Sequence, residues 1–116
     1  MTGPMHVAID YDGTYTAAPE AWSAAVAVLR DAGVRVSMVT ARDDRYDRTA
    51  ELDMIAEAGT PVHFTRGFAK RQWMAHIAED PVDVWIDDRP ESVIANSDRT
   101  VEDLAIWRNG RQRGSR

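Results

Sequence analysis

Short apolar runs rich in β-branched residues alternate along the chain with segments of helical periodicity. The apolar runs span residues 7–9, 34–39 and 82–86, and a weaker run spans residues 61–64. Continuous runs of this kind are typical of strands that are buried on both faces of a sheet. Apolar positions at helical spacing predict helices over residues 19–29, 45–58 and 69–78. Pro19 suits the first turn of the first helix, and Gly33 ends that helix.

The alternation of strands and helices with short connections predicts an α/β fold. We expect a three-layer, Rossmann-like parallel sheet with helices on both faces. The 116 residues suit a single domain that spans residues 1–116. Residues 108–116 contain several Arg and no acidic residue, so we expect a flexible basic tail, with an arm that steers nucleic acid as the alternative. The region around Ala105 and Ile106 fits either a last strand or a helix.

Each of the three strong apolar runs is followed directly by a polar cluster. The clusters span residues 10–14, 40–43 and 87–90. The carboxyl ends of parallel strands meet at one edge of a sheet, and ligands bind at that edge where the strand order reverses. We therefore expect the polar clusters to converge on one site.

The chemistry of the clusters favours a metal ion and a phosphate group. Four carboxylates, those of Asp10, Asp12, Asp87 and Asp88, would repel one another unless a cation lies between them. Oxygen ligands without Cys or a well-placed His favour Mg²⁺. One carboxylate could attack a phosphate ester while a neighbour moves a proton. The Thr40 hydroxyl, the amides after it and the Lys70 ammonium would neutralise the phosphoryl oxygens.

Composition and charge narrow the classes of function. The formal net charge of −5 excludes a protein that binds nucleic acid through its overall charge, so any basic patch would be local. Cys is absent, which excludes disulfides, thiolate metal sites and a Cys nucleophile. No secretory leader is visible at residues 1–6, and no apolar run has membrane-spanning length. We expect a cytoplasmic protein without a membrane partner.

The motifs resemble, in the same order, those of the haloacid dehalogenase superfamily. Residues 7–14 resemble its first motif, an apolar strand followed by Asp-x-Asp-Gly-Thr. Val39 and Thr40 resemble the second motif, Lys70 resembles the third, and residues 85–88 resemble the fourth. The resemblance implies a Mg²⁺-dependent phosphatase that works through an aspartyl-phosphate.

The resemblance also implies a role for each matching residue. Asp10 matches the nucleophile, and Asp12 matches the general acid, which later activates water and lends its backbone carbonyl to Mg²⁺. In the last motif Asp88 matches the carboxylate that reaches the metal and Asp87 a supporting group, although the sequence leaves open which of the two is the direct ligand. The predicted catalytic residues are Asp10, Asp12, Thr40, Lys70 and Asp87, the substrate-binding residues are Gly13, Thr14, Ala41 and Arg42, and the metal ligands are Asp10, Asp12 and Asp88.

The short segments between the motifs leave no room for the cap domains that select substrates in this superfamily. We therefore expect a capless enzyme with an open site that admits a large substrate. Residues 40–42, 73–78 and 83–89 further resemble the phosphatase half of bacteriophage polynucleotide kinase–phosphatases, which remove 3′-phosphates. That resemblance implies a nucleotide or a polynucleotide 3′ end as substrate and assigns Arg42 to the active site.

Other interpretations remain open for several residues. Asp-rich strand ends can be ordinary turns, and Thr40 can cap the turn that follows it. Arg42 can form an ion pair with its acidic neighbours at positions 43 and 44, and Arg89 suits a brace against Glu91. At the level of function, the alternatives are a phosphatase of a small phosphometabolite or a phosphoprotein, and a catalytically silent module that binds phosphate and metal.

Overall fold

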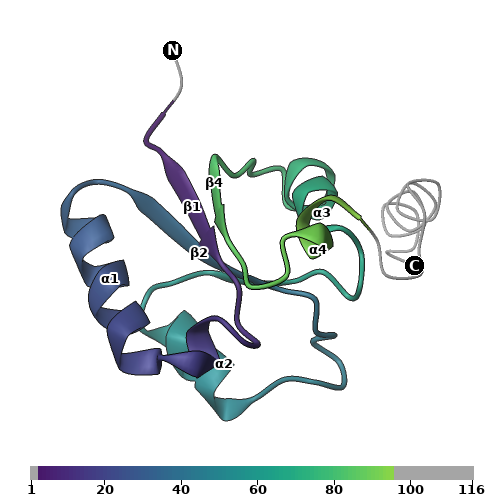
Figure 1. The fold of residues 1–116 in the computed structure, drawn as a ribbon, viewed down its shortest axis with the longest axis horizontal. Helices are drawn as coiled ribbons and strands as arrows, with labels where there is room; N and C mark the ends of the chain where they lie inside the picture. Colours follow the sequence, from purple (N-terminus) through teal and green to yellow (C-terminus); the bar gives the residue numbers. More distant parts are fainter. Residues whose placement is uncertain (1–2, 96–116) are drawn as a thin grey trace.

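A computed structural model describes residues 3–95, and its strands form one four-stranded parallel sheet (Figure 1). The strands are β1 (His6–Ile9), β2 (Arg35–Thr40), β3 (Val62–Phe64) and β4 (Val84–Ile86). Their order across the sheet is β3-β2-β1-β4, and every neighbouring pair is parallel. The sheet and its intervening helices confirm the α/β class. The predicted tail at residues 108–116 and the region around Ala105 and Ile106 lie outside the described residues.

The strand order reverses at β1, which lies in the interior of the sheet. β2 and β3 lie on one side of β1, and β4, the last strand in the sequence, lies on its other side. Ile9 is in register with both Met38 and Ile86, so the ends of the three strands lie side by side. The polar residues after β1 and β4 therefore emerge together at the point where strand order reverses.

The three predicted helices are present, but one of them starts later than the sequence pattern indicates. They are α1 (Pro19–Asp31), α2 (Ala50–Glu57) and α3 (Lys70–His76). The expected start of α2 at residue 45 was wrong, because the Asp43 carboxylate accepts from the Arg45 amide at 2.8 Å and holds a turn there. Thr49 then caps the helix by accepting from the Leu52 amide at 3.1 Å. Two short elements were not predicted, the 3₁₀ helix η1 (Tyr15–Ala17) and α4 (Glu91–Ile94).

Alternate positions of the strands pack against different helices. Val7, Ile9 and Val36 form a buried cluster that α1 covers with Trp22, Val26 and Leu29. Ala8 and Val39 point the other way and form a cluster with Phe68, Trp73, Met74 and Ile77, against which Trp85 also packs. Trp73 is buried in this cluster, and Trp85 is partly buried against it. The sheet is therefore held by apolar contacts at both sets of alternating positions.

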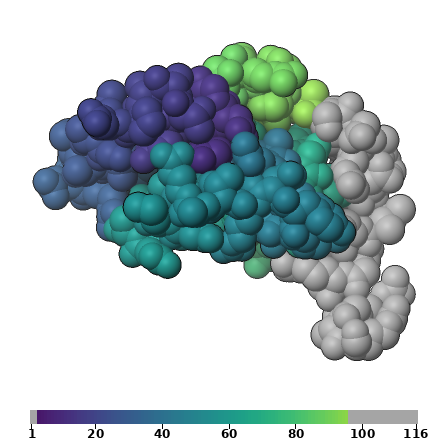
Figure 2. Space-filling view, turned by 90° about the horizontal axis from the view of Figure 1, so that it is seen from below, coloured from purple at the N-terminus to yellow at the C-terminus, as the bar shows by residue number. Residues whose placement is uncertain are grey.

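Helices α1 and α2 lie next to each other on one side of the molecule. Figure 2 shows the blue surface of α1 beside the teal surface of the segment that contains α2. A cavity of about 340 Å³ lies between them, lined in part by Val26 and Ala27 of α1 and Met54 and Ile55 of α2. Among residues 3–95, no helix has the length and apolar character needed to cross a membrane.

Candidate active site

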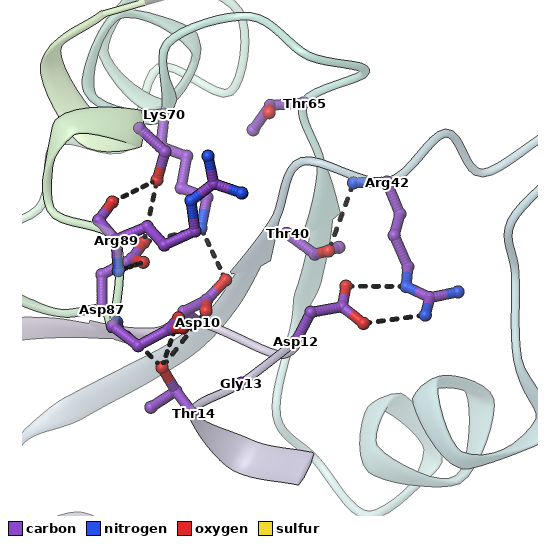
Figure 3. A network of polar contacts seen from close by, with 12 residues as sticks. Asp10, Asp12, Gly13, Thr14, Thr40, Arg42, Thr65, Lys70, Asp87 and Arg89 are labelled. Carbon is purple, nitrogen blue, oxygen red and sulfur yellow. Dashed lines mark hydrogen bonds and ion pairs between the residues drawn. The ribbon is translucent and has the colours of Figure 1, made fainter. Parts of the chain in front are cut away.

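Asp10 lies at the centre of a polar network at the carboxyl end of β1 (Figure 3). Its amide donates to the Ile86 carbonyl at 2.9 Å, which ties the end of β1 to the end of β4. Asp10 is 6% exposed, and its carboxylate accepts at Oδ1 from Lys70 Nζ at 2.6 Å and at Oδ2 from Thr14 Oγ1 at 3.2 Å. Burial raises the pKa of Asp10 to about 6, against the lowering effect of Lys70. Asp10 is thus a buried, polarised carboxylate at the switch point of the sheet.

Lys70 joins the ends of β1 and β4 through its ammonium group. Nζ donates to Asp10 Oδ1 and to Asp87 Oδ2, each at 2.6 Å, and the whole residue is 2% exposed. Lys70 is the first residue of α3, so the helix directs it across the sheet edge toward both carboxylates. The two carboxylates compensate the positive charge of this buried ammonium group. The ammonium group also lies beside Asp10, where it could face an anion bound there.

Three of the four predicted aspartates come together as a potential cation site. Asp10, Asp87 and Asp88 each offer an oxygen, and these oxygens all lie within 4.8 Å of one another. An all-oxygen donor set of this size fits Mg²⁺, which binds through one or two carboxylates and keeps several water ligands. The pKa of the Asp88 carboxyl lies below its usual range, because Asp10 and Thr14 form hydrogen bonds with it.

Asp87 and Asp88 differ in how their carboxylates are already used. Asp87 accepts from Lys70 Nζ at 2.6 Å, from the Arg89 amide at 2.9 Å and from Ser92 Oγ at 3.3 Å. Asp88 is exposed and accepts at Oδ1 from Thr14 Oγ1 at 3.2 Å. Asp88 is therefore the more accessible carboxylate for an incoming ion, and Asp87 is suited to hold Lys70.

Gly13 and Thr14 shape the loop that carries the first two aspartates. Gly13 has φ 82°, and a Cβ built there would lie 2.4 Å from Asp88 Oδ2. Only glycine combines this left-handed backbone with so close an approach of Asp88. Thr14 Oγ1 accepts from the Asp88 amide at 3.1 Å and lies 3.2 Å from oxygens of both Asp10 and Asp88. In this structure both residues contact the aspartates, and their expected contact with substrate stays a prediction.

The Asp12 carboxylate lies apart from this cluster and pairs with Arg42. Arg42 Nε and one Nη each donate to Asp12 at 2.8 Å, and the other Nη donates to the Asp47 carbonyl at 3.0 Å. The Arg42 guanidinium also lies over the Tyr11 ring, 5.4 Å from its centroid. Asp12 is the partner of Arg42, in place of the acidic neighbours Asp43 and Asp44 considered from the sequence. The Asp12 carboxylate thus lies outside the group formed by Asp10, Asp87 and Asp88, and the predicted contact of the Asp12 backbone carbonyl with a metal ion stays a prediction.

Thr40 and Ala41 lie on the rim that joins the ends of β2 and β3. Thr40 is 1% exposed, and its Oγ1 accepts from the Arg42 amide at 3.2 Å, which is the capping contact considered above. Accepting this bond leaves the hydroxyl proton available to donate. The Ala41 carbonyl accepts from the Gly67 amide at 3.0 Å, which ties the two loops together. Figure 3 shows Thr40 in the same part of the molecule as Asp10 and Lys70, and the roles expected of Thr40 and Ala41 stay predictions.

Ser92 belongs to the network, and the sequence pattern did not identify it. Its Oγ lies 3.3 Å from Asp87 Oδ2 and 2.8 Å from the Arg89 carbonyl. The only available signal was a Ser early in a helix after an acidic turn, which is too common to be informative. The expected brace between Arg89 and Glu91 is confirmed, with Nε and Oε2 3.5 Å apart.

Comparisons of the chain with protein-family models, with curated proteins and with solved structures found no match. The function of the site is therefore inferred from its own residues: a buried carboxylate beside an ammonium group, a cluster of oxygen ligands, and a second aspartate held by an arginine.

Proposed function

We propose that this protein is a Mg²⁺-dependent phosphomonoester hydrolase that attacks its substrate with Asp10. The observation that carries the proposal is the setting of Asp10, whose buried carboxylate contacts Lys70 at 2.6 Å and adjoins Asp87 and Asp88. A nucleophilic carboxylate, a cation for the phosphoryl oxygens and acidic ligands for a metal ion are the groups that phosphoryl transfer requires.

In the first step a carboxylate oxygen of Asp10 attacks the phosphorus atom of the ester. The bond between phosphorus and the leaving oxygen breaks, and that oxygen takes a proton from Asp12. The products are an alcohol and an aspartyl-phosphate on Asp10. Arg42, which holds both oxygens of Asp12 at 2.8 Å, stabilises the carboxylate that this proton transfer leaves behind.

In the second step Asp12 acts as a base and removes a proton from water. The water oxygen attacks the phosphorus atom, and the bond to Asp10 breaks. Inorganic phosphate leaves, Asp10 is restored as a carboxylate, and Asp12 is protonated again. One aspartate therefore serves as acid and then as base, and Figure 3 shows the Asp12 side chain directed away from Asp10 toward Arg42.

The metal ion would be held by the carboxylates of Asp10 and Asp88 and by the backbone carbonyl of Asp12. When bound, Mg²⁺ neutralises negative charge on the phosphoryl oxygens and on the clustered carboxylates. Asp87 keeps Lys70 in place through its 2.6 Å contact. Lys70 and the Thr40 hydroxyl then bind the remaining oxygens of the phosphoryl group.

The arrangement supports a capless, three-layer, Rossmann-like phosphatase of the haloacid dehalogenase type. Only η1 separates Thr14 from α1, and only α2 and β3 lie between β2 and α3. An open site of this kind suits a nucleotide or the 3′-phosphate end of a polynucleotide as substrate. A small phosphometabolite or a phosphoprotein is the competing substrate class.

Hydrolysis of p-nitrophenyl phosphate tests the reaction without regard to the natural substrate. We expect Mg²⁺-dependent release of phosphate, and we expect Asp10→Asn to reduce it about a thousandfold or more. Asp53→Asn is the matched control, because Asp53 is a surface residue of α2 paired with Arg48. Equal activity of Asp10→Asn and the control would refute the proposal, and so would the absence of activity on every phosphomonoester, which would leave a silent binding module.

A further inference from the structure

Two arginines flank the site from opposite sides, and they differ in how firmly other residues already hold their side chains. Figure 3 shows Arg42 beyond Asp12 on one side and Arg89 with Asp87 and Lys70 on the other. Arg42 is anchored by the two Asp12 oxygens and the Asp47 carbonyl, at 2.8 to 3.0 Å. A substrate anion could recruit Arg42 only by breaking these contacts.

Arg89 has a fixed backbone and a loosely held side chain. Its amide donates to Asp87 Oδ1 at 2.9 Å, which fixes its backbone beside the cluster. Its side chain is 76% exposed, and its ion pair with Glu91 is 3.5 Å long with Glu91 65% exposed. An exposed pair of this length contributes little free energy, so Arg89 can exchange Glu91 for another anion at small cost.

A small cavity lies beside Arg89 and adjoins the candidate active site. It has a volume of about 130 Å³ and is lined by Ala41, Gly67, Phe68, Arg89, Glu91, Ser92 and Ala95. Ala41 follows Thr40 at the end of β2, and Ser92 contacts Asp87 at 3.3 Å, so two of its walls belong to the site. A phosphate group fits a space of this size.

We propose that Arg89 and this cavity form a subsite for a second phosphate group, carried by the leaving-group side of the substrate. The inference rests on the proposed phosphatase function and deepens it, because it selects substrates that bear another negatively charged phosphate or phosphodiester near the scissile ester. A guanidinium can donate to two phosphate oxygens at once, and a leaving group that is apolar or neutral offers no charged oxygens for this contact. The Glu91 carboxylate competes with this second phosphate group for the Arg89 guanidinium.

Two substrates that differ only in one charge test the subsite. The first is a 3′-phosphorylated dithymidine with a natural phosphodiester linkage, and the second is the same compound with a neutral methylphosphonate linkage. Each has a single phosphomonoester, so released phosphate reports the same bond in both. The measured quantity is the ratio of kcat/KM for the charged compound to kcat/KM for the neutral compound.

We expect a ratio of about 5 to 10 for the wild type, because an exposed charge-assisted contact contributes less than a buried one. Arg89→Gln should bring the ratio close to one. Glu91→Gln should raise the ratio above the wild-type value, because it removes the competing carboxylate. The second variant keeps the test decisive even if Arg89→Gln folds poorly.

The results separate the subsite from the underlying reaction. A wild-type ratio near one, or a ratio that neither variant changes, would overturn the subsite while hydrolysis of p-nitrophenyl phosphate still supported the phosphatase. Failure to hydrolyse p-nitrophenyl phosphate and both dinucleotides would refute the phosphatase itself. Ratios that move in opposite directions in the two variants would establish Arg89 as a specificity-determining residue.

Discussion

Arg42 and Asp12 form a two-pronged ion pair at 2.8 Å for each prong, between loops that are 30 positions apart in the sequence. The same guanidinium donates to the Asp47 carbonyl at 3.0 Å, and the pKa of Arg42 is raised because Asp12 accepts its hydrogen bonds. The pair fixes the direction of the Asp12 carboxylate. Arg42 is thus a positioning residue for the proposed general acid.

Arg42→Lys should lower kcat and leave KM within a few-fold of the wild type. Lysine keeps the charge but cannot hold both oxygens of Asp12, so the carboxylate loses its orientation. A misplaced acid of this kind reduces the rate about 10- to 100-fold. Steady-state kinetics on p-nitrophenyl phosphate would measure both constants. Arg45→Lys is the control, because Arg45 pairs with Asp43 in the same loop. A raised KM with unchanged kcat would instead assign Arg42 to substrate binding.

A comparison of Gly13→Ala with Gly33→Ala distinguishes the effect of backbone strain on stability from an effect on the candidate active site. Both glycines have left-handed backbones, with φ 82° and 86°, so each substitution should cost about 1–2 kcal/mol in unfolding free energy. The new Cβ at position 13 would meet Asp88 at 2.4 Å, whereas the Cβ at position 33 has nothing within 4 Å. We expect only Gly13→Ala to lose Mg²⁺ binding and activity. Urea unfolding with and without Mg²⁺ would measure the stabilisation of each variant by Mg²⁺. Equal stabilisation of Gly13→Ala and Gly33→Ala by Mg²⁺ would contradict the role of Gly13.

Asp88→Asn should weaken Mg²⁺ binding more than Asp87→Asn does. Asp88 is exposed, while Asp87 is already bonded to Lys70, Arg89 and Ser92. Loss of a supporting group typically reduces metal affinity about 10- to 100-fold, and loss of a direct carboxylate ligand should reduce it by more. Calorimetric titration of Mg²⁺ would rank the two variants. A larger loss in Asp87→Asn would make Asp87 the direct ligand.

The stability of the metal-free protein should depend on pH through Asp10. The pKa of Asp10 is about 6 when folded, against an ordinary value of 3.8. Its contribution to stability is therefore present below pH 3.8 and is lost as the pH rises through 6. The shift corresponds to at most about 3 kcal/mol.

Asp10→Asn lacks this titration, which makes it the reference for the measurement. The difference in unfolding free energy between wild type and variant, measured by urea unfolding in a chelator, should move in favour of the variant between about pH 4 and about pH 6.5. A difference that stays constant over this range would show that Asp10 is not desolvated.

The strands and their polar ends were predictable because their pattern is local. Residues 36–39 contain three apolar residues and one small Ser, and such a run indicates burial on both faces of the sheet wherever its neighbours lie. The convergence of Asp10 and Asp87 also followed, because each lies at the edge where parallel strands end, whereas Lys70 comes to the same edge from the first residue of α3. The later start of α2 was missed, because the side chain of Asp43 competes for the backbone with a helix that the apolar spacing favours.

The separation of Asp12 from the other aspartates could not be predicted from the sequence. It depends on Arg42 meeting Asp12 across two loops, and on Gly13 turning the chain so that Asp88 approaches its backbone. Spacing along one chain segment carries no information about such a contact. The sequence also could not show that the Arg42 side chain is held more firmly than that of Arg89. Arg42 is held because the Asp47 carbonyl and the two Asp12 oxygens accept its hydrogen bonds.

Detection of a phosphoryl group on Asp10 tests the central claim most directly. Asp12→Asn should still be phosphorylated by p-nitrophenyl phosphate, whose leaving group needs no acid, but it should lack the base that activates water. The aspartyl-phosphate should therefore accumulate, and mass spectrometry after an acid quench should locate it on Asp10 and find none in Asp10→Asn. Release of phosphate by the wild type without any modified Asp10 in Asp12→Asn would contradict the proposed mechanism.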